Sequence, residues 1–322
     1  MRRSYLSFSL LLLLVISCKN SGSGPESTSV SRSGSKPNIV YILADDLGYG
    51  DLSFLGQEKF RTPQIDRMAE EGMVFTQHYA GSTVCSPSRA VLFTGMHTGH
   101  APIRGNFKVD GGDFPMPESA YLLPEMLKEQ GYVTGAFGKW GMGFAGSSGS
   151  PEKCGIDEWY GYVSQTLAHN YYPENLWHNT EKIILEGNLN GGEKEYSFDL
   201  IHKAALDFID ANKDTTFFLY LPYTIPHAEL KVPDDSIFRK FKGMFPEFYY
   251  QGVDDGPKFR KGPYCSQEFP HATFAAMVTR LDLAVGDILN KLEELGLDGN
   301  TLVIFTSDNG PHREGGADPD YF

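Results

Sequence analysis

Short apolar runs along the chain predict the strands of a buried β-sheet. Residues 38–44 read Asn-Ile-Val-Tyr-Ile-Leu-Ala and are rich in β-branched and aliphatic side chains, without the polar alternation of a half-exposed strand. A run of this kind is typical of a parallel strand that is covered on both faces. Similar runs predict further strands at residues 73–79, 132–137, 216–221 and 301–306.

Segments between these runs predict helices. Thr62 as N-cap, Pro63 at the first helical position and Gly72 after the last one delimit a helix. Residues 229–270 show little periodicity and are expected to form a long loop over one face. Further helices are expected at residues 122–130, 196–212 and 274–295, the last two with an apolar face.

Strands and helices alternate, and this order predicts an α/β fold: a mainly parallel central sheet with helices on both faces. Polar residues follow the C-terminal ends of the predicted strands. In open α/β sheets these ends meet at one edge, where ligands bind, so we expect the polar residues to converge there. They are Asp45, Asp46, Lys139, His227, Asp308 and Asn309.

Two adjacent carboxylates, Asp45 and Asp46, end the first predicted strand and are followed by glycines. Because like charges repel, such a pair is unfavourable as packing alone, and a hard divalent cation would remove the conflict. Asp308 and Asn309 would add a carboxylate and an amide oxygen to the cation's ligands. The alternative is a solvated acidic turn.

A cysteine and an arginine stand one helical turn apart in Cys85-Ser86-Pro87-Ser88-Arg89. Proline and serines suit a first helical turn, where serine oxygens can cap free amides. Cys85 would then lie at a helix N-terminus that favours an anion, with Arg89 on the same face. This arrangement suggests a site for a tetrahedral oxyanion ester. The alternative is a buried thiol and an unrelated surface cation.

Composition narrows the possible functions. The 322 residues are enough for one large α/β domain or two smaller ones, and 41% apolar with 13% aromatic residues is typical of a globular protein. The net charge of −13 and the pI near 5.1 argue against a nucleic-acid partner.

The N-terminus predicts export. Arg2 and Arg3 precede an apolar stretch that is too short to span a bilayer. The stretch ends in Val-Ile-Ser-Cys18, which resembles a bacterial lipobox with Cys18 as the acylated residue. We therefore expect a lipoprotein signal segment at residues 1–18, a serine- and glycine-rich flexible tether at 19–36 and the folded domain at 37–322. The protein is predicted to be a bacterial lipoprotein tethered to the membrane, in the periplasm or at the cell surface. In such an oxidising compartment, Cys154 and Cys265 could form a disulfide or remain thiols.

Several segments together resemble the type I sulfatases, a branch of the alkaline-phosphatase-like superfamily. Residues 85–89 match the family signature C-x-P-S-R, and residues 37–48 resemble its N-terminal metal-binding strand. Gly138-Lys139-Trp140 resembles the start of the motif G-K-W-H-x-G, and residues 222–227 match the segment P-x-x-x-P-H. The resemblance covers roughly residues 37–322.

The resemblance implies a role for each matching residue. Cys85 would be oxidised to Cα-formylglycine, the hydrated aldehyde nucleophile, by a maturation enzyme before export. Lys139 and Arg89 would offset the charge of the sulfate, and His227 would protonate the leaving alcohol. One Ca²⁺ would be bound by Asp45, Asp46, Asp308, Asn309 and residue 85.

The sequence also departs from the family pattern. Position 141 is glycine where the family motif has a histidine that is thought to help release sulfate. His169 is a candidate for its replacement or for a substrate contact, and His312 could face the substrate; surface positions are the alternative for both. The further lysine segment and the small C-terminal subdomain of the family are expected to be missing.

The function that the resemblance implies is hydrolysis of sulfate esters, as in arylsulfatases, with sulfated carbohydrates or other sulfated small molecules as substrates. Two alternatives remain. A phosphomonoester or phosphonate-ester hydrolase could use the same metal edge, and the missing histidine would suit a lipoprotein that binds sulfated glycans without cleaving them.

Overall fold

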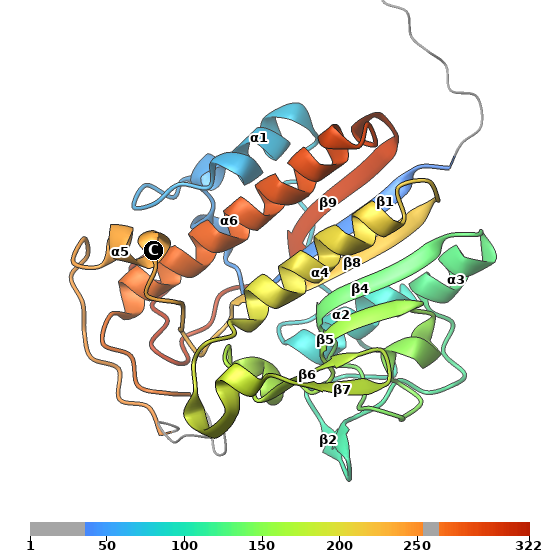
Figure 1. Cartoon of the computed structure of the whole chain (residues 1–322), viewed down its shortest axis with the longest axis horizontal. Coiled ribbons are helices and arrows are strands. Elements are labelled where there is room, and N and C mark those ends of the chain that lie inside the picture. Colours follow the sequence, from blue (N-terminus) through green and yellow to red (C-terminus); the bar gives the residue numbers. More distant parts are fainter. Residues whose placement is uncertain (1–35, 254–263) are drawn as a thin grey trace, which may run out of the picture. The chain divides into compact units, whose positions relative to one another are not determined.

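A seven-stranded sheet runs through the computed structural model, which describes residues 36–253 and 264–322. The strand order is β7-β6-β5-β4-β8-β1-β9 (Figure 1). The five strands from β5 to β9 in this order are parallel, whereas β6 and β7 form an antiparallel hairpin at one edge. The strands are β1 (Asn38–Asp45), β4 (Val133–Lys139), β5 (Glu158–Tyr162), β6 (Asn175–His178), β7 (Glu181–Ile184), β8 (Phe217–Pro226) and β9 (Thr301–Ser307).

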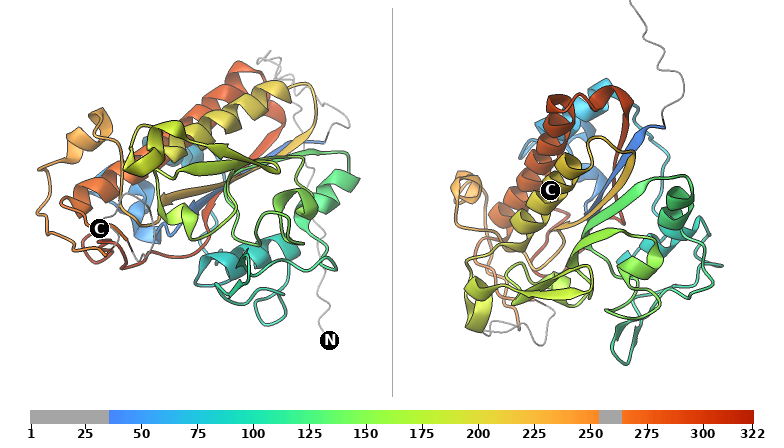
Figure 2. Two further views of the ribbon diagram at one scale, coloured as in Figure 1. Left: turned by 60° about the horizontal axis from the view of Figure 1, so that its bottom comes forward. Right: turned by 45° about the vertical axis from the view of Figure 1, so that its right-hand side comes forward.

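Helices cover both faces of this sheet. Helices α1, α4 and α6 lie on one face and α2 and α3 on the other (Figure 2). A two-stranded hairpin, β2 (Lys108–Val109) with β3 (Gly112–Asp113), stands apart from the sheet. The helices are α1 (Pro63–Glu71), α2 (Cys85–Thr94), α3 (Leu123–Glu129), α4 (Ser197–Ala211), α5 (Ser236–Phe241) and α6 (Pro270–Glu294). Short 3₁₀ turns occur at Tyr49–Asp51, Ser53–Leu55, Pro151–Cys154, Leu167–His169, Glu186–Gly191 and Asp298–Asn300.

The apolar runs of the central strands fill two cores at once. In β1, Val40 and Ile42 pack into the core beneath α4 and α6, while Leu43 packs into the core beneath α2 and α3. Side chains in β8 alternate in the same way. Successive side chains of a strand point to opposite faces, so a strand covered on both faces must be apolar at nearly every position.

The predicted α/β class and mainly parallel sheet are confirmed. Four of the five predicted strands are present, as β1, β4, β8 and β9, but β8 continues beyond its expected end at residue 221 to Pro226. The strand predicted at residues 73–79 is wrong. This segment is irregular. Among the described residues it pairs with no strand, and the edge of the sheet is β9. Without a neighbour, an apolar run has strand propensity but no hydrogen bonds to form. Its side chains are largely exposed: Met73 78%, Phe75 72% and Tyr79 76%.

Other parts of the fold differ from the sequence expectation. Strands β5, β6 and β7 were not predicted, since they are only four or five residues long and β5 contains a glycine. The expected loop at 229–270 contains α5, which Asp235 caps by accepting from the amides of Ile237 and Phe238. Cys154 is a buried thiol, so the disulfide that it could have formed with Cys265 is absent from the described structure.

The predicted signal segment, with Cys18, and the tether up to residue 35 lie outside the described residues. Where the structure is described, no helix is both long and apolar enough to cross a bilayer.

Candidate active site

Four neighbouring parallel strands deliver polar residues to one edge of the sheet. Strand β1 ends at Asp45 and β4 at Lys139, while His227 directly follows β8 and Asp308 directly follows β9. Because β4, β8, β1 and β9 are adjacent and parallel, their C-terminal ends share that edge. Helix α2 starts at the same place and adds its first residue, Cys85.

Cys85 lies buried between a carboxylate and an ammonium group. Its thiol donates to Oδ1 of Asp45 at 3.3 Å, and Nζ of Lys139 donates to its Sγ at 3.2 Å. Burial raises the pKa of the Cys85 thiol well above its usual range, and the charges of Asp45 and Asp308 raise it further. A buried neutral thiol is a weak nucleophile.

Two buried cations hold the carboxylates of this edge. Nζ of Lys139 is 2.6 Å from Oδ2 of Asp45. The guanidinium of Arg89 donates to Oδ2 of Asp308 at 2.9 and 3.1 Å, and it lies 3.4 Å from Asp45. Burial alone would lower the pKa of both cations, but Asp45 and Asp308 keep both groups charged by raising their pKa above the ordinary values. Arg89 is therefore not the surface cation of the alternative interpretation.

The pKa values of two carboxylates at this edge, Asp45 and Asp308, are shifted in opposite directions. Burial would raise the pKa of Asp45, but Lys139, His227 and Arg89 together lower it below its ordinary value. Burial and the charge of Asp45 raise the pKa of Asp308. Three carboxylates, those of Asp45, Asp46 and Asp308, thus lie close to the two buried cations Lys139 and Arg89.

The donor atoms of this edge could hold a divalent cation, and its carboxylate and amide oxygens are ligands that a hard cation prefers. Asp45, Asp46, Cys85 and His227 each offer a ligand atom, and these atoms lie within 4.8 Å of one another. Asn309 donates through Nδ2 to Asp46 and to the carbonyl of Gly310, while its buried Oδ1 has no hydrogen-bond partner. Buried polar atoms are almost always satisfied, so an orphaned amide oxygen beside carboxylates is a fitting ligand for Ca²⁺.

Three histidines stack along one side of the cluster. The ring of His227 lies between those of His169 and His312, with centroids 4.8 and 5.5 Å away. Nδ1 of His227 faces the carbonyl of Ala228, which can only accept, so Nδ1 carries a proton and Nε2 faces Asp46 at 3.4 Å. Burial lowers the pKa of His169 and His312, and the charge of His227 lowers both further, against the opposing effect of Asp46 on His312. His169 and His312 are partly buried against His227, and whether either contacts a substrate stays a prediction.

The serines of the C-x-P-S-R segment do not cap α2 as expected. Ser86 Oγ donates to the carbonyl of Gly141, and Ser88 Oγ donates to the carbonyl of Asp308. The amide of Ser86 is instead capped by Oδ1 of Asn106, 20 residues further along the chain. No sequence signal marked Asn106, because its contact depends on how the loop after α2 folds back.

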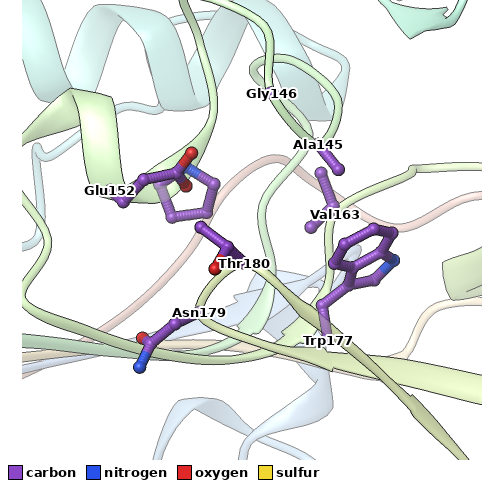
Figure 3. Close-up of a pocket in the computed structure, with 8 residues that line it drawn as sticks. Ala145, Gly146, Glu152, Val163, Trp177, Asn179 and Thr180 are labelled. Carbon is purple, nitrogen blue, oxygen red and sulfur yellow. The ribbon is translucent and has the colours of Figure 1, made fainter.

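A separate pocket of about 270 Å³ lies beside β6 and shares no residue with the Cys85 cluster (Figure 3). Trp177 and Val163 form an apolar wall, with Glu152 and Asn179 at its other sides. Oδ1 of Asn179 already accepts from the amide of Trp159. This pocket therefore does not include the cluster around Cys85.

Comparison with known proteins identifies the family. The chain matches the Sulfatase family model over residues 37–321. The chain belongs to the sulfatase family. The superfamily assignment, alkaline-phosphatase-like, is confirmed with it.

Related sulfatases cover most of this chain. N-acetylgalactosamine-6-sulfatase of Rattus norvegicus is 32% identical over 311 residues, which are 87% of this chain and 52% of that protein. N-acetylgalactosamine-6-O-sulfatase of Bacteroides thetaiotaomicron is 30% identical and covers 87% of this chain and 60% of its own length. The crystal structure of Ps i-CgsB in complex with k-i-k-neocarrahexaose has a TM-score of 0.71 at 30% identity, covering 88% of this chain and 61% of that one. The chain thus spans about half the length of the first curated relatives that it matches.

We predict that Asn309→Leu weakens Ca²⁺ binding. The leucine has a similar shape but no ligand oxygen, and loss of one contributing group from a metal site typically costs at least ~10-fold in affinity. Calorimetric titration of Ca²⁺ into the purified protein measures the change. Asp298→Asn, which removes an exposed carboxylate at the opposite end of β9 from the cluster, is the control and should bind as the unmodified protein does. Equal affinity of the Asn309→Leu variant would show that Asn309 is not a ligand.

Proposed function

We propose that this protein hydrolyses sulfate esters of carbohydrates, with residue 85 as Cα-formylglycine and one Ca²⁺ bound beside it. The observation that carries the proposal is the position of Cys85, enclosed by Asp45 and Lys139 at the start of α2. Membership of the sulfatase family supports the reaction class.

The proposed metal ligands are Asp45, Asp46, Asp308, Asn309 and residue 85. A bound divalent cation would polarise the sulfate oxygens and favour the ionised form of the attacking hydroxyl. Oxidation of Cys85 to formylglycine would supply that hydroxyl, since the hydrated aldehyde carries two. The buried thiol itself is neutral and poorly suited to attack.

Lys139 and Arg89 are proposed to stabilise the charge of the sulfate. Both are fully buried and remain cationic, so their N–H groups act at a place with little water to screen them. They are also fixed in position before the substrate arrives, because Asp45 and Asp308 hold them. Preorganised donors of this kind need no rearrangement when charge develops in the transition state.

His227 is proposed to protonate the leaving alcohol. Its ring is anchored through Nδ1 to the carbonyl of Ala228, which leaves Nε2 toward the cluster. A histidine held in this way can act as a general acid through Nε2. His169 and His312, stacked on either side, are proposed to contact the substrate, and His169 is the candidate to replace the histidine missing at position 141.

Sulfated carbohydrates are proposed as substrates because of the relatives. Two of them are named N-acetylgalactosamine-6-sulfatases, and one solved structure holds k-i-k-neocarrahexaose. An oligosaccharide that carries sulfate esters is therefore the first substrate class to test.

The nucleophile can be tested by mass spectrometry together with turnover. We expect the peptide that contains residue 85 to carry formylglycine after co-expression with a maturation enzyme, and the matured protein to release sulfate from 6-sulfated N-acetylgalactosamine. Cys85→Ala should abolish release while leaving folding intact.

An active protein with an unmodified thiol would refute the formylglycine mechanism. Faster turnover of an aryl phosphate than of an aryl sulfate would favour the phosphoesterase alternative. Binding of sulfated glycans without any cleavage by formylglycine-bearing protein would favour the binding-protein alternative.

The role of His227 can be tested through the leaving group. We expect His227→Gln to slow hydrolysis of an alkyl sulfate by ~10²–10⁴-fold, because the alkoxide needs a proton as it leaves. Nitrophenyl sulfate, whose leaving group is stable as an anion, should be affected far less. The measurement is the steady-state kcat of the variant and the unmodified protein on both substrates. An equal decrease in kcat on both substrates would contradict a role of His227 as general acid.

We also propose that the protein is exported and held at a membrane by lipid on Cys18. The lipobox-like sequence before Cys18 supports this. Cells that express the full chain should incorporate labelled fatty acid into the protein, and Cys18→Ser should abolish the label and release the protein from membranes. Membrane retention of the serine variant without label would exclude this anchor.

A further inference from the structure

Position 141 is the place where the chain departs from the family motif, and its surroundings show what fills the space. Gly141 follows β4 and Trp140 with a left-handed backbone, φ 74°. A Cβ at this position would lie 3.1 Å from Cγ and from Cδ of Gln165 and 3.2 Å from its Nε2. Side chains at positions 141 and 165 therefore compete for one volume, and here Gln165 occupies it.

Gln165 is buried, at 6% exposure, and its amide group is engaged on both N–H bonds. Nε2 donates to Oγ of Ser86 and, at 3.3 Å, to Oδ1 of Asn106. Its backbone amide donates to the buried carboxylate of Asp113 at 2.7 Å, and this hydrogen bond fixes the backbone from which the side chain extends. A buried glutamine with both ends held has one available orientation.

Ser86 connects this network to the nucleophile position. Its Oγ accepts from Gln165 and donates to the carbonyl of Gly141 at 2.5 Å, and its amide donates to Asn106 at 3.1 Å. Donors and acceptors thus match throughout the set of Ser86, Asn106, Gly141 and Gln165. Because Ser86 is covalently next to Cys85, these contacts fix the first turn of α2, and with it the direction in which residue 85 points.

We propose that Gln165 is a positioning residue: it orients residue 85 through Ser86, and the glycine at position 141 makes room for it. The inference rests on the proposed function, because it concerns the alignment of the same nucleophile. The hydrogen bonds described for Gln165 reach Ser86, Asn106 and Asp113 and neither Asp45 nor Lys139, so we expect it to affect the rate by positioning residue 85. Misplacement of a reacting group by about 1 Å can cost ~10²-fold in rate.

The first test removes the amide but keeps the length of the side chain. Gln165→Met should lower kcat per formylglycine by ~10²-fold and leave KM within about threefold, since substrate contacts are unchanged. Gln57→Met is the matched control, because Gln57 is equally buried and donates to two backbone carbonyls elsewhere, those of Gly50 and Phe322. This control should lower the melting temperature about as much as Gln165→Met does, with kcat unchanged.

The second test uses the shared volume. Gly141→Ala alone should lower kcat, because the new methyl group displaces Gln165. The strain that the left-handed backbone places on any side chain should appear in both Gly141 variants as a lower melting temperature, which is measured separately. The double variant Gly141→Ala with Gln165→Ala should lose no more activity than Gln165→Ala alone, since the two sites act on one element. Additive losses would overturn the inference.

Two further results would show whether Gln165 positions residue 85. Wild-type kcat per formylglycine in Gln165→Met would overturn the inference, and so would a loss explained entirely by a lower fraction of matured residue 85. If the unsubstituted protein carries formylglycine and releases sulfate, only the role of Gln165 is in question. If it releases no sulfate when matured, the proposed function fails and the positioning role fails with it.

Discussion

The structure depends on keeping three carboxylates together at one buried edge. Asp45, Asp46 and Asp308 would repel one another there, and burial makes the repulsion stronger because little water screens it. Lys139 and Arg89 relieve part of it through short contacts, and both cations would be unfavourable in the core without the carboxylates. The same pairs join α2, β1, β4 and β9, so the electrostatic balance also sets the geometry of the site. A divalent cation would relieve the carboxylate repulsion that remains.

The chemistry of residue 85 follows from this environment. A position that favours a metal-bound oxygen between carboxylates is unfavourable for a thiolate, and the pKa of the Cys85 thiol is correspondingly raised. The surroundings thus agree with a residue that is to be converted into another chemical group. The ring stack of His169, His227 and His312 then provides the side of the cluster from which a proton could be delivered to a leaving alcohol.

Much of the fold and the meeting of the site residues could be predicted from the sequence, because both follow from local patterns. The apolar run of β1 ends at Asp45, and in a parallel sheet any residue at a strand's C-terminal end must reach the same edge as its neighbours. Predictions failed where the local structure depends on contacts with a segment distant in the sequence. Residues 73–79 have strand propensity but no neighbouring strand, and β6 pairs over so few residues that its alternation cannot be recognised. Asn106 and Gln165 carry no local signal, since their contacts with Ser86 arise only when distant loops pack together.

The most direct test of the account is a crystal structure of the matured protein with Ca²⁺, using anomalous scattering to locate the ion. We predict one anomalous peak at the sheet edge, with ligand oxygens from Asp45, Asp46, Asp308, Asn309 and residue 85, while Lys139 and Arg89 keep their places. A peak elsewhere, or an occupied site that lacks residue 85 among its ligands, would contradict the claim that this edge exists to hold a cation against the nucleophile.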